Sequence, residues 1–321
     1  MEVIMGDHCH GKARVRVARR WKGAAANGGD CFKEWNAAAQ VWCAANAKSY
    51  VSGDNSSVVA TDSVKNACLL AAKSLAQPAS CEDFAVAVAT DLVARYPGMH
   101  TRCVVQVSEV PWVRVAEGGT PHEHGFVRCT AGGERFCEAD ARAEHGMEGM
   151  VRVTSGVREL RVLKTTKSGW EGFVRDGLTL LPDTSERMLA SAVTARWTYG
   201  NGARTFKLGS PLPAVARDPA VGCYDACAAA VVEALKQAFY GPARDGKYSP
   251  GVQATLYEMG AAALKAVPGV EAVTLAMPNL HFNPLRLPKP VDVQFDDDIF
   301  VPVDEPHGQI EATVQRPKAR M

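Results

Sequence analysis

The sequence passes twice through the same order of elements, which are strands, then helices, then strands. In the first half, alternating basic and apolar residues over 12–17 predict a half-buried strand, and helical spacing after residues 61 and 80 predicts two helices. The second half starts near residue 150 and repeats this order. The sequence therefore predicts the α+β class with two similar units, residues 1–148 and 149–286, followed by a tail at 287–321.

Both helices of the first half carry start signals. Thr61-Asp62-Ser63 is typical of an N-cap, and Ser80 with Asp83 resembles a capping box. Pro97-Gly98 is expected to end the second helix. The predicted buried faces are Val64, Cys68 and Ala72 in the first helix and Phe84, Val88 and Leu92 in the second. Strand-like runs follow at 103–115 and around 125–136.

The second half is predicted to begin with a long strand pair over 151–162, followed by a strand over 193–199. Pro219 fits the first position of one helix, and Ser249-Pro250 fits the cap and first position of another. Val273, Leu275 and Met277 alternate as in a closing strand. The tail from Pro288 onward is rich in Pro and Asp, so we expect a surface segment there.

Composition excludes several classes of protein. The 36 basic and 35 acidic residues give a net charge of +1, which does not favour partners such as nucleic acid or an anionic membrane. No apolar run is long enough to span a membrane, and the N-terminus lacks the pattern of a secretory signal. The ten cysteines include no CxxC, and the nearest pair is Cys223 and Cys227. We expect them to act as small buried hydrophobes.

Three short motifs have ordinary structural alternatives. Residues 241–247 have the spacing of a phosphate-binding loop, but Tyr248 replaces the required Ser or Thr and a helix precedes the loop, so a nucleotide hydrolase is disfavoured. His122 and His124 suit a metal pair or a structural pair, and no third ligand stands at a recognised spacing. The acidic run 296–298 is typical of a solvated turn.

Six segments, in order along the chain, point to one family. They are residues 10–17, 58–66, 121–126, 163–173 with a closing Arg187, 252–257 and 277–282. Together they resemble the uricase (urate oxidase) family, in the form found in plants and algae. The resemblance implies tandem tunnelling-fold units, with antiparallel sheets and helices on one face, in a barrel-like homotetramer. It also implies that urate, dioxygen and water become 5-hydroxyisourate and hydrogen peroxide without a metal or organic cofactor.

The resemblance also implies a urate-binding set. A flat anion rimmed with carbonyl and N–H groups needs a planar cation, an amide and a ring to stack on. Arg187 and Gln253 match residues that grip the purine edge, and Val252 matches one that uses its backbone. Trp170 stands where the family stacks a Phe on urate. Leu178 and His10 also replace aromatic residues of the family pattern, the latter a Tyr.

Lys12, Thr61 and His281 match the catalytic trio of the family. A lysine whose pKa is lowered by burial can accept a urate proton, which the threonine hydroxyl relays. Asn279 matches the residue that holds dioxygen or the attacking water. The resemblance further implies that Thr61 and Asp62 reach into the site of a neighbouring subunit. An inactive purine-binding relative is the alternative, and retention of the trio and Asn279 argues against it.

The last three residues, Ala319-Arg320-Met321, follow a small-basic-apolar pattern. This pattern resembles a variant of the peroxisomal targeting tag. A peroxide-producing enzyme fits that compartment, so the sequence predicts a peroxisomal location.

Overall fold

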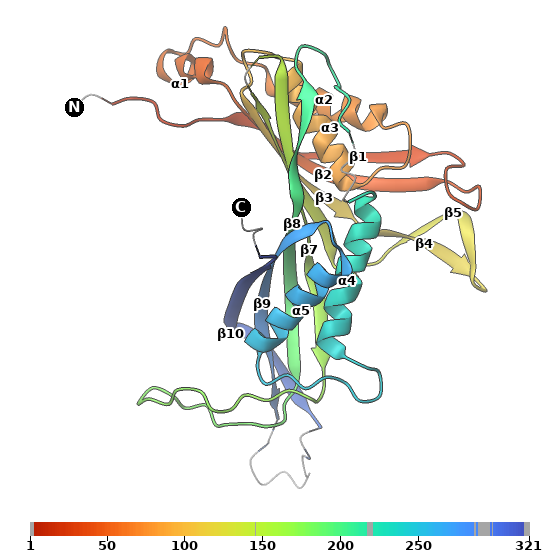
Figure 1. The fold of residues 1–321 in the computed structure, drawn as a ribbon, viewed down its shortest axis with the longest axis vertical. Coiled ribbons are helices and arrows are strands. Elements are labelled where there is room, and N and C mark those ends of the chain that lie inside the picture. The colour runs from red at the N-terminus through yellow and green to blue at the C-terminus, as the bar shows by residue number, and fades with distance from the viewer. Residues whose placement is uncertain are drawn as a thin grey trace. The chain divides into compact units, whose positions relative to one another are not determined.

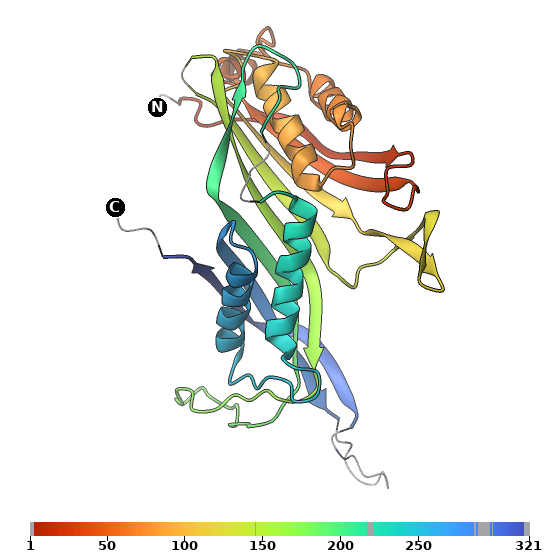
Figure 2. The same ribbon diagram turned by 45° about the vertical axis from the view of Figure 1, so that its right-hand side comes forward.

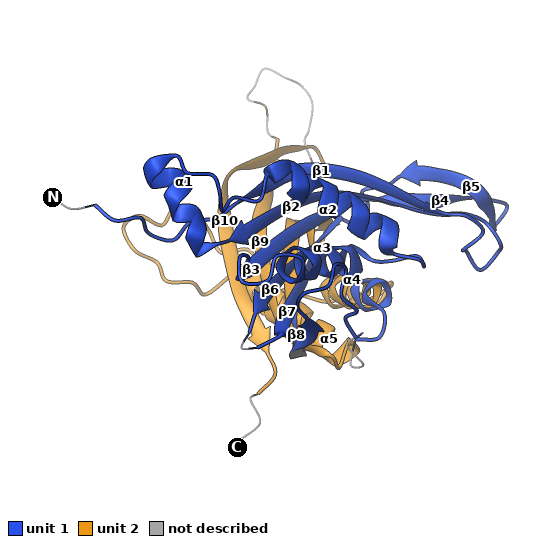
Figure 3. Cartoon of the chain, turned by 90° about the horizontal axis from the view of Figure 1, so that it is seen from above, with its two compact units in different colours: residues 1–156, 198–228 blue, residues 157–197, 229–321 orange. Residues whose placement is uncertain are grey.

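The computed structural model describes residues 3–144, 146–216, 221–285, 287, 296 and 298–317. The chain packs as two compact units, shown in different colours in Figure 3. Unit 1 comprises Met1–Gly156 and Thr198–Ala228, and unit 2 comprises Val157–Trp197 and Ala229–Met321. Strands β7 (Glu148–Lys164) and β8 (Leu189–Lys207) each contribute one segment to either unit. The repeat boundaries expected from the sequence, at 148 and 286, stay a prediction.

Unit 1 contains an antiparallel sheet in which β1 pairs with β2, β2 with β3, and β3 with β6. These strands are β1 (His10–Trp21), β2 (Cys31–Trp42), β3 (Arg102–Val110) and β6 (Glu134–Ala143). The strand expected over 12–17 is therefore confirmed as part of β1. The run expected over 103–115 is divided at Pro111, which has no N–H for a ladder hydrogen bond. A separate hairpin of β4 (Trp112–Glu117) and β5 (Thr120–Arg128) follows it.

Helices α2 (Thr61–Ser74) and α3 (Cys81–Ala94) cover one face of this sheet (Figure 1). The short η1 (Ala44–Asn46) and α1 (Ala47–Ser52) precede them in the chain. All six predicted helix-face side chains are buried, and the Ser80–Asp83 capping box is present. The N-cap expected from Thr61-Asp62-Ser63 is wrong. Thr61 is already helical, and the cap is Ala60, which makes no side-chain hydrogen bond.

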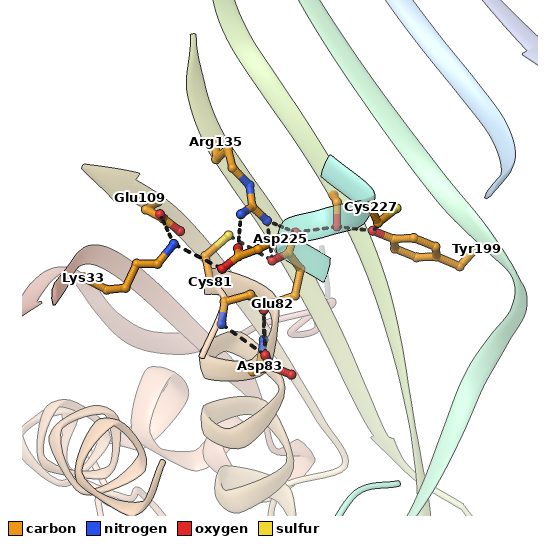
Figure 4. A network of polar contacts seen from close by, with 11 residues as sticks. Lys33, Cys81, Glu82, Asp83, Glu109, Arg135, Tyr199, Asp225 and Cys227 are labelled. Carbon is orange, nitrogen blue, oxygen red and sulfur yellow. Dashed lines mark hydrogen bonds and ion pairs between the residues drawn. The ribbon is translucent and has the colours of Figure 1, made fainter. Parts of the chain in front are cut away.

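A polar network in unit 1 gathers around the start of α3 (Figure 4). Glu82 is fully buried, and both of its carboxylate oxygens accept hydrogen bonds from Arg135, at 2.8 and 2.7 Å. Ser155 donates a third bond at 2.8 Å, and Arg135 also pairs with Asp225. The network joins two helices and two strands, and no local sequence pattern predicts it.

Unit 2 has β9 (Val270–Pro284) and β10 (Phe300–Gln315) as an antiparallel pair, with α5 (Val252–Ala266) packed against both (Figure 2). The alternating Val273, Leu275 and Met277 are fully buried, which confirms the closing strand. Helix α4 (Tyr224–Tyr240) precedes α5. No helix among the described residues is long and apolar enough to cross a membrane.

Three expectations for the second half are corrected or refined. The strand pair over 151–162 is one continuous strand, β7. Part of the tail, residues 300–315, forms strand β10 on the edge of β9, with an irregularity between Val303 and Gly308, and most of its side chains are exposed as expected. Helix α5 begins after Gly251 rather than at Pro250, since Ser249 is buried and its hydroxyl bonds Thr255 instead of capping. Pro219 lies outside the described residues.

Candidate active site

A cavity of about 630 Å³ in unit 2 brings together four of the residues that the sequence singled out. Trp170 and Arg187 belong to the segment between β7 and β8, and Asn279 and His281 belong to β9. This volume is in the usual range for a small-molecule site. The α+β architecture thus places a stacking ring, a cation, an amide and an imidazole around one space.

Short backbone ladders hold the two residues of the β7–β8 segment. The Gly169 N–H donates to the Ser249 carbonyl at 2.8 Å, and the Arg187 N–H donates to the Ser168 carbonyl at 2.7 Å. Trp170 and Thr184 exchange two further bonds, of 2.7 and 3.0 Å. Main-chain hydrogen bonds therefore hold Trp170, Arg187 and the segment before α5 in fixed positions relative to one another.

Arg187 is a half-buried cation without an acidic partner among the residues that the structure describes. Its Nε atom is buried and makes no hydrogen bond there. Burial lowers the pKa of the guanidinium, an effect that nearby Tyr248 partly opposes. The neighbouring Glu186 carboxylate instead accepts the backbone N–H of Lys167 at 2.6 Å. A buried donor left unpaired is costly, so Arg187 is suited to an anionic ligand in the cavity.

Trp170 provides the aromatic wall of the cavity. Its ring stacks on Phe173, with centroids 5.6 Å apart and an angle of 9° between the planes. Phe173 in turn lies 4.8 Å from the guanidinium carbon of Arg175, which is ion-paired with Asp183. Phe173 lies in the 163–173 segment but was not expected at the site, because no regular element there fixes which side chains meet.

Val252 and Gln253 are the first two residues of α5, at the positive end of the helix dipole. The Val252 side chain is buried, so only its backbone is available to a ligand. Gln253 is exposed, and its Oε1 atom would lie 3.5 Å from a Cβ built on Gly251. The same Cβ position is next to the Trp170 ring. Gln253 and Trp170 therefore both lie close to Gly251.

Asn279 and His281 share one face of β9, because side chains alternate along a strand. They pair with Gly308 and Val303 of β10. Between these two pairs, residues 304–307 of β10 oppose only Leu280. Such irregularities bend a strand and re-aim its side chains, and they are frequent beside active sites. Here the irregularity is opposite the two polar residues that line the cavity.

Lys12, Thr61 and Asp62 form a second cluster, in unit 1. A bulge in β1 immediately follows Lys12, where the register shifts before Val15 and Arg14 has a φ of 59°. The Asp62 carboxylate accepts hydrogen bonds from Lys65 and Asn66. The bond from Lys65 lowers the pKa of Asp62 most, and the charge of Lys12 adds to this effect. Lys12 is thus close to the start of α2.

His10 links the strand that carries Lys12 to the segment before Thr61. Its Nε2 lies 2.8 Å from the Val59 carbonyl, and its Nδ1 lies 2.9 Å from the Asn46 amide nitrogen. With Nε2 protonated, the ring donates to one group and accepts from the other. The sequence marked His10 only as a departure from the family Tyr, and the structure gives it this linking contact.

Both alternative motifs lie among the described residues. His122 and His124 have ring centroids 5.6 Å apart on β5, but the described residues contain no group of three His, Cys, Asp or Glu side chains that would hold a metal. Residues 241–247 form a turn between α4 and α5, in which the Gly246 N–H donates to the Pro242 carbonyl. The Ala319-Arg320-Met321 tail lies outside the described residues.

Comparison with known proteins identifies the family. The profile described as Uricase matches residues 8–139 and 153–311. The chain belongs to the uricase family. It is 42% identical to the Arabidopsis thaliana "Uricase" over 97% of this chain and 95% of that protein. It is 40% identical to "Uricase-2 isozyme 1" of Canavalia lineata over 98% of this chain and 97% of that protein. Both relatives are plant proteins, as the resemblance suggested.

The fold comparison agrees with this family. The crystal structure of uricase from Arthrobacter globiformis superimposes with a TM-score of 0.78 at 27% identity, covering 100% of this chain and 98% of that one. The α+β fold class with antiparallel sheets, expected from the sequence, is confirmed. The roles assigned to the individual site residues stay predictions.

Proposed function

We propose that this protein is a urate oxidase, which converts urate, dioxygen and water to 5-hydroxyisourate and hydrogen peroxide. Family membership supports the reaction, and the relatives named above carry the name uricase. The observation that carries the proposal is Arg187, a partly buried cation whose Nε has no hydrogen-bond partner in the described part of the chain, at a cavity that also has an aromatic wall. A flat anion is the ligand that satisfies both features at once.

The proposed binding of urate uses Arg187 and Trp170 of the cavity together with the first two residues of α5. The Arg187 fork donates to carbonyl oxygens on one edge of the purine, and the Gln253 amide both donates to and accepts from the same edge. Trp170 stacks on the ring face. The Val252 backbone N–H, at the start of α5, contributes a donor where the helix dipole favours negative charge.

The oxidation requires a base and a place for dioxygen. In this proposal Lys12, with Thr61 as relay, removes a proton from urate and makes the purine electron-rich. Two electrons then pass from the purine to dioxygen, which leaves as hydrogen peroxide, and water supplies the new hydroxyl group. Asn279 holds dioxygen or water above the ring, and His281 assists on the same strand face. Neither a metal nor an organic cofactor is needed for this electron transfer.

We propose that the active form is a homotetramer whose sites are shared between subunits. Lys12, Thr61 and Asp62 belong to unit 1, and the other candidate residues belong to unit 2. Co-expression of a Thr61→Ala chain with an Arg187→Gln chain tests the sharing. Suppose that each site takes the Thr61 cluster from one chain and Arg187 from another. In a random mixture of the two variants, about one site in four then combines an intact Thr61 cluster with an intact Arg187. If one chain supplies both clusters, every site keeps a defect.

The decisive experiment is the oxidation of urate by purified protein in air, followed by the loss of urate absorbance and by peroxide formation. Activity supports the proposal. Binding of a urate analogue without urate oxidation would instead identify an inactive purine-binding member of the family.

We also propose a peroxisomal location, based on Ala319-Arg320-Met321. A fluorescent reporter that ends in the last ten residues should enter peroxisomes. The same reporter without the final three residues should stay in the cytosol. Equal distribution of the two reporters would contradict the proposal.

A further inference from the structure

The six-membered ring of Trp170 lies directly against Gly251. A Cβ atom built on Gly251 would stand 2.8 Å from Cζ3 and 3.0 Å from Cε3 of the indole. Carbon atoms in good contact are about 3.5–4.0 Å apart. No side chain at position 251 therefore fits while the indole keeps this position.

The backbone at position 251 does not itself require glycine. Gly251 has φ of 167° and ψ of 163°, an extended conformation that any residue adopts. It is also the N-cap of α5, a position where Ser, Thr, Asp and Asn are usually preferred because their side chains bond the first helical N–H groups. Glycine gives no such bond. The requirement for glycine here is one of space.

The indole is confined on two sides. Phe173 stacks on one face of the ring at 5.6 Å, and Gly251 receives the edge of the six-membered ring. The Gly169–Ser249 backbone bond holds the two segments together at 2.8 Å. These contacts hold the ring beside Val252 and Gln253 at the start of α5.

We propose that Gly251 is a specificity-determining residue of this cavity, because it provides the space in which Trp170 presents its stacking surface to the ligand. Trp170 and Gly251 act as one pair, which sets the distance between the aromatic wall and the Gln253 amide. With an indole at position 170, residue 251 must be glycine to leave room for the ring. A smaller ring at position 170 leaves room for a side chain at position 251. The identity of the ligand, a flat purine anion, rests on the proposed function.

A double-mutant cycle tests the pair, with Gly251→Ala made in the wild-type and Trp170→Phe backgrounds. In the presence of Trp170, the new methyl group displaces the indole, and we expect the KM for urate to rise about tenfold with a smaller change in kcat. In the Trp170→Phe background, the same substitution should change KM less than about twofold. The Gly177→Ala variant is the control, because nothing lies within 4 Å of a Cβ there and its KM should match that of the wild type.

A binding measurement accompanies the kinetics. The affinity for a urate analogue that is not oxidised, measured by calorimetry so that the readout does not depend on Trp170, should show the same coupling between positions 170 and 251. A purely structural role would lower the thermal midpoint without this dependence of affinity on the residue at 170. An equal loss of affinity in both backgrounds, or no loss in either, overturns the pairing.

The outcomes also separate this inference from the proposed function. A wild-type protein that oxidises urate but shows no coupling contradicts the pairing alone. One that binds the analogue with coupling but oxidises no urate contradicts the proposed function alone. A wild-type protein that binds no purine overturns both.

Discussion

The backbone N–H of Arg187 donates a 2.7 Å hydrogen bond to the carbonyl of Ser168, two residues before Trp170. The cation and the ring of the cavity are therefore held by one short piece of main-chain ladder. A site held in this way loses little conformational entropy when a ligand binds, and the position of each group is set before the ligand arrives.

Replacing Arg187 by Lys should weaken urate binding while preserving the charge. An ammonium group does not reproduce the planar fork of the guanidinium, and one charge-assisted hydrogen bond is lost. We expect KM to rise by about 10–100-fold. The matched control is Arg161→Lys, because Arg161 is 75% exposed and pairs only with Glu159 among the described residues. Steady-state kinetics of both variants provide the measurement, and equal KM values would contradict the role of Arg187.

Replacing Lys12 by Met should leave the fold intact and lower kcat by about two to four orders of magnitude, the usual effect of removing a positioned base. Methionine keeps the length of the side chain but accepts no proton. The Lys22→Met variant serves as the control, since Lys22 is exposed outside the cluster of Lys12, Thr61 and Asp62. A Lys12→Met enzyme with a near-normal rate excludes Lys12 as the base.

Activity should survive exhaustive treatment with a chelator. The proposed electron transfer runs directly from the deprotonated purine to dioxygen, so removal of divalent metal ions should leave the rate unchanged. The assay compares urate oxidation before and after EDTA treatment and after re-addition of metal ions. Loss of activity that a metal restores would reassign His122 and His124, the histidine pair on β5.

Replacing Glu82 by Ala should destabilise the protein by about 3–5 kcal/mol, because Arg135 is left as a buried charge without its main partner. The exposed pair of Glu233 and Lys236 provides the contrast, and Glu233→Ala should have little effect on stability because solvent screens the pair. Chemical denaturation measures both free energies of unfolding. Similar values for the two variants would show that burial of the Glu82 pair has no special effect.

Acid should weaken the fold through His100. This side chain is buried, its Nδ1 donates to the Leu92 carbonyl at 2.7 Å, and burial lowers its pKa, to which nearby His10 contributes. The unfolded chain therefore takes up a proton at a higher pH than the folded chain does. Stability is fully present above about pH 6.5 and is lost as pH falls toward the lower folded pKa.

The measurement is the thermal midpoint between neutral and mildly acidic pH, for the wild type and for His100→Asn. Asparagine keeps a donor near the Leu92 carbonyl and does not titrate. The wild type should lose more stability on acidification than the variant does. Parallel curves would assign the acid sensitivity to other groups.

Local sequence patterns were enough to predict the elements that are stabilised by residues close together in the chain. Phe84, Val88 and Leu92 form a buried helix face as their spacing predicts, and the Ser80–Asp83 box starts that helix. These features depend on residues three or four positions apart, for which helix geometry alone fixes the neighbours. The resemblance to the family supplied the candidate site residues, because its motifs are short segments that occur in the same order in this sequence.

The tertiary structure decided the relationships between residues far apart in the chain. Glu82 meets Arg135, and Trp170 meets Gly251, through strand register and packing that no local spacing encodes. Residues 300–315 form a strand because their backbone pairs with the edge of β9, and their own sequence pattern did not predict a strand. Long-range contacts depend on the whole chain being folded, so the sequence by itself determined the helix faces and the motif residues. Only the packed structure decided which of these residues share a cavity.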